Sequence, residues 1–518
     1  MATSDDRKKT AWRARRIIYN DDGADAAAPG ADTPDGFLNI RLAPLSGTQV
    51  DTVCYNTNNG AMVCGHTSTV AEMLGKYVDS QSAPLFRTWT NNLTALERLG
   101  TDPLALAREF TREHGMELFW SLRMNDLHDG GHNEMFTTFK REHPQRLLGR
   151  REDCAKHPPE DPRQCWTAMD YEQSANRDYM FRIIEDVGRR YDVDGIELDY
   201  FRFPLYFRRN LTLLPATQRD IDVLTALQRR VATFVRERSR DRQRIMLLAA
   251  RVPLTVDKCR YIGIDIEQWL SEGLVDVLIT GGGYEPLTMP VGELADFGHR
   301  HEVPVYPCIS NSGLQRDHQR IEAWRAAAAN AHHAGADGVY TFNLFPSSRE
   351  IVTEDGHQLT TGPQWLQVLH EIGDVATLAG KDKMFGIDRA IMLPTLSHAS
   401  PCPDGLPREI GEALNVVVPV YEDVNEVQGG RPLEMVTLRL RITNLRDRAD
   451  LHVRWNGVRI ETSRALDSAA EVDGHWVRCS LPRELIHRGE NRMLLTRPPQ
   501  SPDHSLLEDV QLWMSSGL

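Results

Sequence analysis

The sequence predicts a (β/α)8 TIM barrel followed by a C-terminal antiparallel β-sandwich domain. Between residues 15 and 375, short apolar runs rich in β-branched and aromatic residues alternate with amphipathic stretches of helical spacing. Eight such runs are present, which is the number of parallel strands that a closed barrel of this kind needs. After about residue 385 apolar and polar residues alternate between turn signals, which is typical of antiparallel strands.

The eight runs are mostly continuous in apolar character, as expected of parallel strands buried on both faces. They span residues 16–19, 53–55, 116–122, 193–198, 245–250, 275–279, 303–306 and 338–342. The alternative is a doubly wound open sheet, which would need a glycine-rich phosphate loop after its first strand, whereas the first run ends in NDDG. Long insertions follow the second and third runs, where loops of a barrel usually build the active site.

The chain divides into three parts on this pattern. Residues 1–14 form an N-terminal extension, 15–385 the (β/α)8 catalytic barrel and 386–518 the β-sandwich accessory domain. Segments such as MVTLRLRITNL and DLHVRWNGVRI supply the strands of the third part. We expect this domain to pack on the barrel or on a second subunit, as in a possible homodimer, and carbohydrate binding is the alternative role.

Composition and charge exclude several classes of partner. The chain has 60 lysines and arginines against 73 acidic residues, a net charge of −13. So acidic a protein has no general attraction for nucleic acid or an anionic membrane, so neither is expected as a partner. No apolar run reaches the roughly 20 residues that cross a bilayer, and the first ten residues are polar, so a cytoplasmic location is expected. Eight cysteines in 518 residues do not form a disulfide scaffold, although Cys154 and Cys165 could be bridged.

Polar residues follow the predicted strands, and in a barrel these positions share one bowl. The candidates are Asp21, Asp22, Asn58, Arg123, Asn125, Asp126, His128, Glu197, Asp199, Tyr200, Arg202, Arg251 and Asn343. Polar residues at the ends of so many predicted strands favour an active site over a set of solvated loops. The three arginines are suited to a carboxylate or phosphate, which arginine binds bidentately, although we expect at least one of them to pair with Glu197 or Asp199.

Two pairs of groups could carry acid–base chemistry. Glu197 and Asp199 are two apart on one strand, which serves a glycosidase poorly because its two groups must flank the sugar about 5–9.5 Å apart. The second pair combines a base, His128 oriented by Asp126, with an acid at Asp22 or Asp21. For this pair to work the pKa of the acid must be raised, and the neighbouring aspartate is expected to raise it.

Asp126, His128, Asp129 and His132 are all metal-ligand types, but their spacing matches no strong metal motif. No metal and no cofactor is therefore expected.

The segments IIYNDDG, MELFWSLRMNDLHD, YDVDGIELDYFRFP and WLSEGLVDVLITGGGY resemble the family-10-like glycosyl hydrolase barrels, and among these the glycoside hydrolase family 156 sialidases. The resemblance runs from about residue 15 to 365. It implies an inverting exo-sialidase that removes terminal sialic acid from a sialylated glycan by His/Asp catalysis.

When the family's motifs are matched to this sequence, the resemblance implies that His128 is the base and that Asp126 lies behind it. It also implies that an aspartate of NDDG is the acid, and of the two we favour Asp22. It implies that Arg123 and Arg202 hold the substrate carboxylate and that Asn343 contacts the sugar. The remaining substrate-binding candidates are Asn125, Glu197, Asp199, Tyr200, Arg251 and Asn58. Two alternatives remain open: a hydrolase for another anionic sugar, uronic or sulfated, and a non-catalytic carbohydrate-binding barrel.

Overall fold

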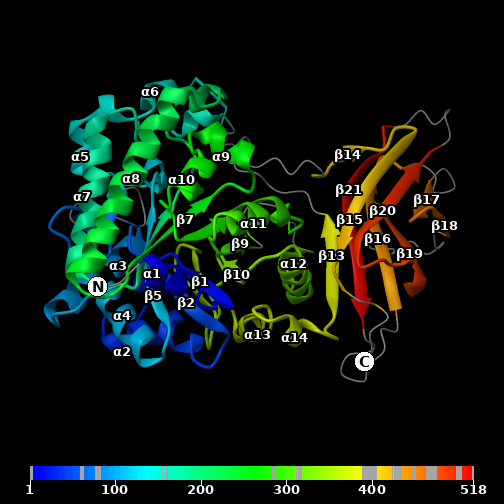
Figure 1. Ribbon diagram of the computed structural model, residues 1–518, viewed down its shortest axis with the longest axis horizontal. Helices are drawn as coiled ribbons and strands as arrows, with labels where there is room; N and C mark the ends of the chain where they lie inside the picture. The colour runs from blue at the N-terminus through cyan, green and yellow to red at the C-terminus, as the bar shows by residue number, and fades with distance from the viewer. Residues whose placement is uncertain are drawn as a thin grey trace.

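Eight parallel strands close into a barrel in the order β1-β10-β9-β8-β7-β6-β5-β2. Helices lie around the barrel, and the antiparallel strands after it form a separate part (Figure 1). The computed structural model describes residues 4–58, 63–75, 83–154, 156–158, 161–282, 287–310, 312, 318–387, 405–422, 424, 435–445, 451–461, 475–497 and 504–515. The barrel strands are β1 (Ile17–Asp21), β2 (Val50–Asn56), β5 (Glu117–Arg123), β6 (Gly195–Asp199), β7 (Leu247–Val252), β8 (Val277–Thr280), β9 (Val305–Ile309) and β10 (Val339–Thr341).

The predicted barrel is confirmed, and each of the eight apolar runs overlaps one barrel strand. Most strands end later than the apolar run that predicted them. Strands β1, β5 and β6 extend to Asp21, Arg123 and Asp199, because ladder hydrogen bonds continue past the last apolar side chain. The polar candidates at these positions are therefore held by the sheet itself.

Helices surround the barrel, and several begin at a clear cap or proline signal. Thr33, Asp102, Thr217 and Thr255 each accept a backbone N–H at a helix start, as N-caps do. The helices are α2 (Pro34–Arg41), α3 (Pro84–Arg98), α4 (Pro103–Glu113), α5 (Thr138–Glu142), α6 (Arg151–Cys154), α7 (Ser174–Arg190), α8 (Gln218–Asp241), α9 (Val256–Ile262), α10 (Ile266–Ser271), α11 (Val291–Arg300), α12 (Ile321–His333), α13 (Leu366–Glu371) and α14 (Val375–Leu378). The insertions add short strand pairs: β3 (Val63–Cys64) with β4 (Glu72–Met73), and β11 (Ile351–Val352) with β12 (Gln358–Thr360).

The N-terminal helix α1 (Ser4–Ala11) is bound to the end of the barrel at which the strands begin. Arg7 donates to Asp276, which precedes β8, at 2.7 Å. Arg15 is fully buried and forms an ion pair with Glu117 at the start of β5, 2.7 Å from Nε to Oε2. Ala11 packs with the apolar side chains that fill the barrel, such as Ile18. The helix thus closes the bottom of the barrel.

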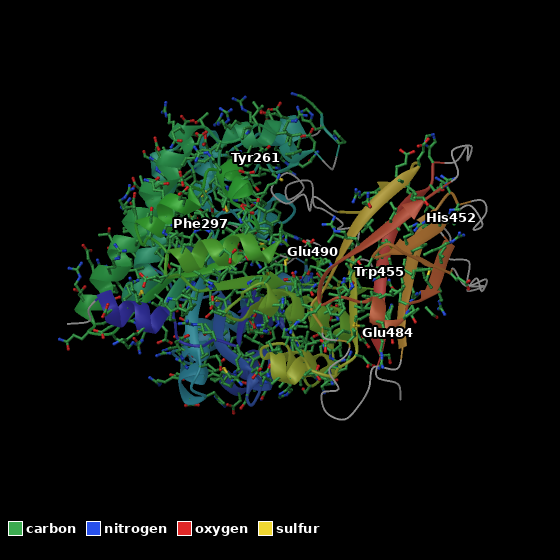
Figure 2. The ribbon with its side chains drawn as sticks, turned by 45° about the vertical axis from the view of Figure 1, so that its right-hand side comes forward. Tyr261, Phe297, His452, Trp455, Glu484 and Glu490 are labelled. Carbon is green, nitrogen blue, oxygen red and sulfur yellow. The ribbon has the colours of Figure 1, made fainter. Side chains whose placement is uncertain are left out.

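The C-terminal part is a sandwich of two antiparallel sheets. One sheet has the order β13-β21-β16-β19, with β14 also paired to β21, and the other β15-β20-β17-β18. The strands are β13 (Lys383–Ile387), β14 (Arg408–Glu409), β15 (Ala413–Val420), β16 (Met435–Thr443), β17 (His452–Trp455), β18 (Val458–Ile460), β19 (His475–Ser480), β20 (Gly489–Thr496) and β21 (Leu506–Ser515). Figure 2 shows the labelled Trp455 within the sandwich, where its side chain is fully buried in a core of its own.

The sandwich packs on the barrel through helix α12, which lies beside β13 (Figure 1). Ala326 of this helix belongs to the sandwich core. Asn330 exchanges hydrogen bonds with the end of β15 and Tyr421, and His333 stacks on Tyr421 with ring centroids 4.0 Å apart. Helix α12 therefore packs against the barrel and against the sandwich.

Two further expectations are settled by the described residues. Cys154 and Cys165 are free thiols, so the bridge between them is absent. Among the helices of the described ranges, none has the length and apolarity to span a bilayer.

We expect Glu117→Gln to lower the free energy of unfolding by about 3 kcal/mol, because it leaves the Arg15 guanidinium buried without its counter-ion. The matched control is Asp51→Asn, since Asp51 pairs with the half-exposed Arg16 and its loss should cost less than about 1 kcal/mol. Urea unfolding of both variants measures the difference. Equal losses would show that the buried pair contributes no more than the surface pair.

Candidate active site

A cavity of about 710 Å³ lies at the C-terminal ends of the barrel strands. It is lined by residues from the strand ends, helix α3, the loop after β5 and the β11–β12 hairpin. The lining residues are Asp22, Ala24, Ala83, Leu85, Phe86, Trp89, Arg123, His128, His132, Met135, Arg202, Ser312, Gln319, Asn343, Phe345, Asp355, Gly356, His357, Gln358, Thr360, Thr361 and Trp365. Five predicted candidates, Asp22, Arg123, His128, Arg202 and Asn343, are thus brought together.

The imidazole of His128 is held at both ring nitrogens. Its Nδ1 lies 2.6 Å from Oδ1 of the fully buried Asp126, and the Arg202 guanidinium lies 3.3 Å from its Nε2. Arginine can only donate, so Nε2 must be the acceptor and Nδ1 must carry the proton. Nδ1 of His128 is thus directed at Asp126, and Nε2 faces Arg202 at the cavity.

Asp126 links the imidazole to a second guanidinium. Its Oδ2 accepts from Nη1 of Arg123 at 2.9 Å, and its Oδ1 accepts from the backbone N–H of His128 at 2.9 Å. Burial raises the pKa of Asp126, but the interaction with the His128 ring and the charge of Arg123 outweigh burial and hold this pKa well below its ordinary value. Asp126 is therefore an ionised carboxylate that orients both neighbours.

Asp22 faces the cavity with its side chain 19% exposed and shares Arg41 with Asp21. Nη1 of Arg41 lies 2.6 Å from Oδ1 of Asp22 and 2.7 Å from Oδ1 of Asp21. Burial raises the pKa of Asp22, but the charges of Arg41 and Arg123 outweigh it and lower this pKa to about 2. The expectation that the neighbouring Asp21 leaves Asp22 with a raised pKa is wrong, because the charges of Arg41 and Arg123 and the hydrogen bonds to Asp22 outweigh the effect of burial.

Asp21 lies beneath Asp22 and does not line the cavity. Its pKa is raised, chiefly by burial, although Arg41 opposes the shift. Asp25, also fully buried, accepts from the Tyr55 hydroxyl at 2.8 Å, and burial together with the charge of Asp21 raises its pKa well above the ordinary value. Of the two aspartates of NDDG, only Asp22 can reach a ligand.

Three further predicted substrate contacts are buried inside the barrel, and two of them, Asp199 and Arg251, form an ion pair. Glu197 accepts from the Tyr340 hydroxyl at 2.9 Å and is fully buried, and burial raises its pKa. Asp199 accepts from two backbone N–H groups of the following loop and lies 3.3 Å from Arg251. Arg251 also donates to the carbonyl of Gly281. These three residues support the floor of the barrel mouth and do not line the cavity.

Tyr200, Asn125 and Asn58, which the sequence predicts as substrate contacts, do not line the cavity. Tyr200 turns outward and donates to Gln228 of α8 at 2.8 Å. Asn125 exchanges hydrogen bonds with Met169, so it joins two loops. Only 1% of the surface of Asn58 is exposed, and its backbone N–H donates to the side-chain oxygen of Asn56. One residue's shift along a strand end decides whether a side chain points into the bowl or away from it.

Sequence reasoning missed several residues of the site. Arg41 comes from helix α2, and its guanidinium stacks on Phe345 at 3.6 Å from the ring centroid. Phe86 and Trp89 come from α3, and Gln319 precedes α12. None of these positions is a strand end, and no spacing relative to the strands marks them.

The alternative of a metal site finds no support in the described part of the chain. Asp129 is buried and forms an ion pair with the buried Lys140 at 2.6 Å, and Asp126 is bound to His128 and Arg123. Within the described residues, no group of three or more histidine, cysteine or acidic side chains is placed to hold a metal ion.

No protein-family model matches the chain, and no curated protein sequence matches it. Among solved structures, it is similar to an endo-beta-1,4-mannanase from Thermotoga petrophila, with 11% identity over 96% of this chain and 97% of that chain and a TM-score of 0.40. It is also similar to a family GH18 chitinase from Chromobacterium violaceum (10% identity, 98% and 89% covered, TM-score 0.36) and an alpha-amylase from Geobacillus thermoleovorans (12% identity, 93% and 99% covered, TM-score 0.37). At these identities and TM-scores the likeness carries no argument about the site, and the fold rests on its own strand order.

The low pKa of Asp22 predicts a pH-dependent contribution to stability. Because the folded pKa, about 2, lies below the ordinary value of 3.8, the contribution is present above pH 4 and is lost as the pH falls toward 2. Asp22→Asn cannot titrate, so the stability advantage of the wild type over this variant should shrink by about 1 kcal/mol between pH 6 and pH 3. Urea unfolding at the two pH values measures this, and an advantage that grows on acidification would contradict the assigned direction.

Proposed function

We propose that this protein is a glycoside hydrolase that removes terminal sialic acid with inversion, with His128 as the base and Asp22 as the acid. The observation that carries the proposal is the His128 imidazole, hydrogen-bonded to Asp126 and contacted by Arg202 in a cavity that also holds Arg123 and Asp22. This set contains a base, a carboxyl group and two cations. Sialic acid carries a carboxylate on its anomeric carbon, so a site for it needs cations beside the catalytic groups.

The contact between Arg202 and His128 gives the base a way to respond to an anionic substrate. The Arg202 guanidinium contacts Nε2, the atom that would accept a proton from water. A substrate carboxylate is a stronger partner for the guanidinium than a neutral imidazole. Its binding to Arg202 would release Nε2, while the hydrogen bond to Asp126 stabilises the imidazolium that forms.

The low pKa of Asp22 also favours an anionic substrate. An acid must be protonated before it can act, whereas Arg41 and Arg123 favour the ionised form of Asp22. A substrate carboxylate placed beside Arg123 would offset the charge of this guanidinium and so raise the pKa of Asp22. A neutral sugar would leave the acid ionised.

The size and walls of the cavity agree with one sugar ring and its substituents. A volume of about 710 Å³ falls within the roughly 300–1,000 Å³ usual for small-molecule sites. Phe86, Trp89 and Met135 supply apolar wall, which suits an acyl group, and Asn343 presents an amide held by Ser312 at 2.9 Å. Asn343 has a φ of 53°, so its backbone takes a left-handed conformation where β10 ends.

A panel of fluorogenic α-sialosides, neutral glycosides and uronides tests the substrate class, and proton NMR of the early product tests the stereochemistry. We expect release from the α-sialosides, with the β-anomer appearing before mutarotation. Release from uronides alone would move the proposal to another anionic sugar. An α-anomer formed first would overturn inversion and direct attention to a nucleophile. Release from no glycoside would favour a carbohydrate-binding barrel.

The second test separates the two candidate acid–base pairs. His128→Asn should lower kcat by about 10²–10⁴-fold, because it removes the base that takes the proton from water. Glu197→Gln keeps the hydrogen bond from Tyr340 and should lower kcat much less, since Glu197 does not line the cavity. Initial rates at saturating substrate give the ranking, and the reverse order would restore Glu197 to the catalytic pair.

A further inference from the structure

The segment that precedes helix α12 lies between the cavity and the β-sandwich. Gln319 lines the cavity, whereas its two neighbours, His318 and Arg320, contact the sandwich strand β21. Arg320 has extended backbone angles, φ −137° and ψ 152°. The backbone N–H of Arg320 donates to the carbonyl of His318 at 2.9 Å, so Gln319 is the central residue of a tight turn. The two side chains that flank this turn contact β21, while that of Gln319 lines the cavity.

The contact at His318 is a buried polar pair between the two domains. Nε2 of His318 lies 2.8 Å from Oδ1 of Asp509, and the two side chains are 1% and 0% exposed. Oδ2 of Asp509 accepts from Gln511 at 3.3 Å, and Gln511 in turn accepts from the Trp513 indole at 3.0 Å. Arg320 lies over that indole, 4.8 Å from the ring centroid. Residues 509, 511 and 513 share one face of β21, so this face forms a polar ladder along the segment.

The neighbouring strand is shaped to admit the histidine. A Cβ added to Gly386 of β13 would lie 3.1 Å from the ring of His318 and 2.5 Å from a backbone oxygen of β21. The helix that follows is fixed as well, since Arg325 pairs with Glu371 at 2.7 Å and donates to the carbonyl of Asp382. The position of Gln319 is therefore set from the sandwich side.

We propose that Asp509 of the β-sandwich is a positioning residue for the cavity, which acts through His318 to hold the Gln319 amide against a polar group of the bound sugar. The sandwich is then a fixed wall of the site and not an independent module. The proposal rests on the proposed function for the identity of the ligand. The placement of Gln319 itself does not depend on that identity.

A double-mutant cycle tests the coupling. Gln319→Ala should raise KM for the cleaved sialoside about tenfold with kcat within about twofold, as expected for one lost hydrogen bond to substrate. Asp509→Ala should raise KM by a similar factor, and the double variant should be no worse than either single one, because both remove the same contact. Asp509→Asn keeps an acceptor for His318 and should restore most of the affinity. Additive effects in the cycle would overturn the positioning role.

The matched control is Asn491→Ala in the other sheet of the sandwich. Asn491 is fully buried and bonded to His487 on both sides of its amide, so its loss destabilises the sandwich without touching His318. Its KM should stay at the wild-type value. A KM that rises as in Asp509→Ala would show that any weakening of the sandwich has this effect, and would contradict the proposal.

Hydrogen–deuterium exchange separates this inference from the proposed function. In Asp509→Ala, amides from residue 318 to the first turn of α12 should exchange at least tenfold faster than in Asn491→Ala. If Asp509→Ala does not fold, His318→Ala replaces it in this comparison. If the wild type cleaves no sialoside, the proposed function fails while this comparison still decides the positioning role. Unchanged exchange at these amides would overturn it.

Discussion

The buried carboxylate of Asp126 is the group on which the candidate site depends. It accepts from the imidazole and backbone of His128 and from the guanidinium of Arg123, so one side chain orients a base and a cation together. A buried charge is stable only when such partners surround it. The strand end that supplies Arg123 and the loop that supplies His128 must therefore keep their positions, and the parallel barrel provides that constraint.

The charge balance around the cavity explains why an anion would matter to the chemistry. Asp22 and Asp21 both pair with Arg41, and Arg123 and Arg202 line the same cavity as Asp22. Arg41 and Arg123 keep Asp22 ionised, and Arg202 contacts the His128 ring. An incoming carboxylate changes both conditions in the direction that catalysis needs. An anionic substrate is therefore part of the proposed mechanism and not only a matter of affinity.

The two domains share more than a surface. Helix α12 packs into the sandwich core through Ala326, and the segment before it carries a cavity residue between two contacts to β21. A polar pair buried between domains stays stable only if both sides hold their geometry. The position of Gln319 and the packing of the sandwich are linked for this reason.

The sequence by itself determined the barrel, the antiparallel domain after it, and the convergence of Asp22, Arg123, His128, Arg202 and Asn343, because hydrophobic periodicity and strand-end position are local properties. Only the tertiary structure decided which polar neighbours face inward. Tyr200 and Asn125 point away from the cavity, whereas Asp199 pairs with Arg251 and Glu197 accepts from Tyr340 inside the barrel. Neighbouring side chains of a strand point to opposite faces, so one position along the strand changes which environment a side chain meets. The tertiary structure also decided the pKa of Asp22, because Arg41 reaches that carboxylate from a helix about twenty residues further along the chain. No local sequence pattern encodes a contact between a strand end and a helix that follows it. The packing of α2 places Arg41 beside Asp22, and the packing of the sandwich places Gln319 at the cavity.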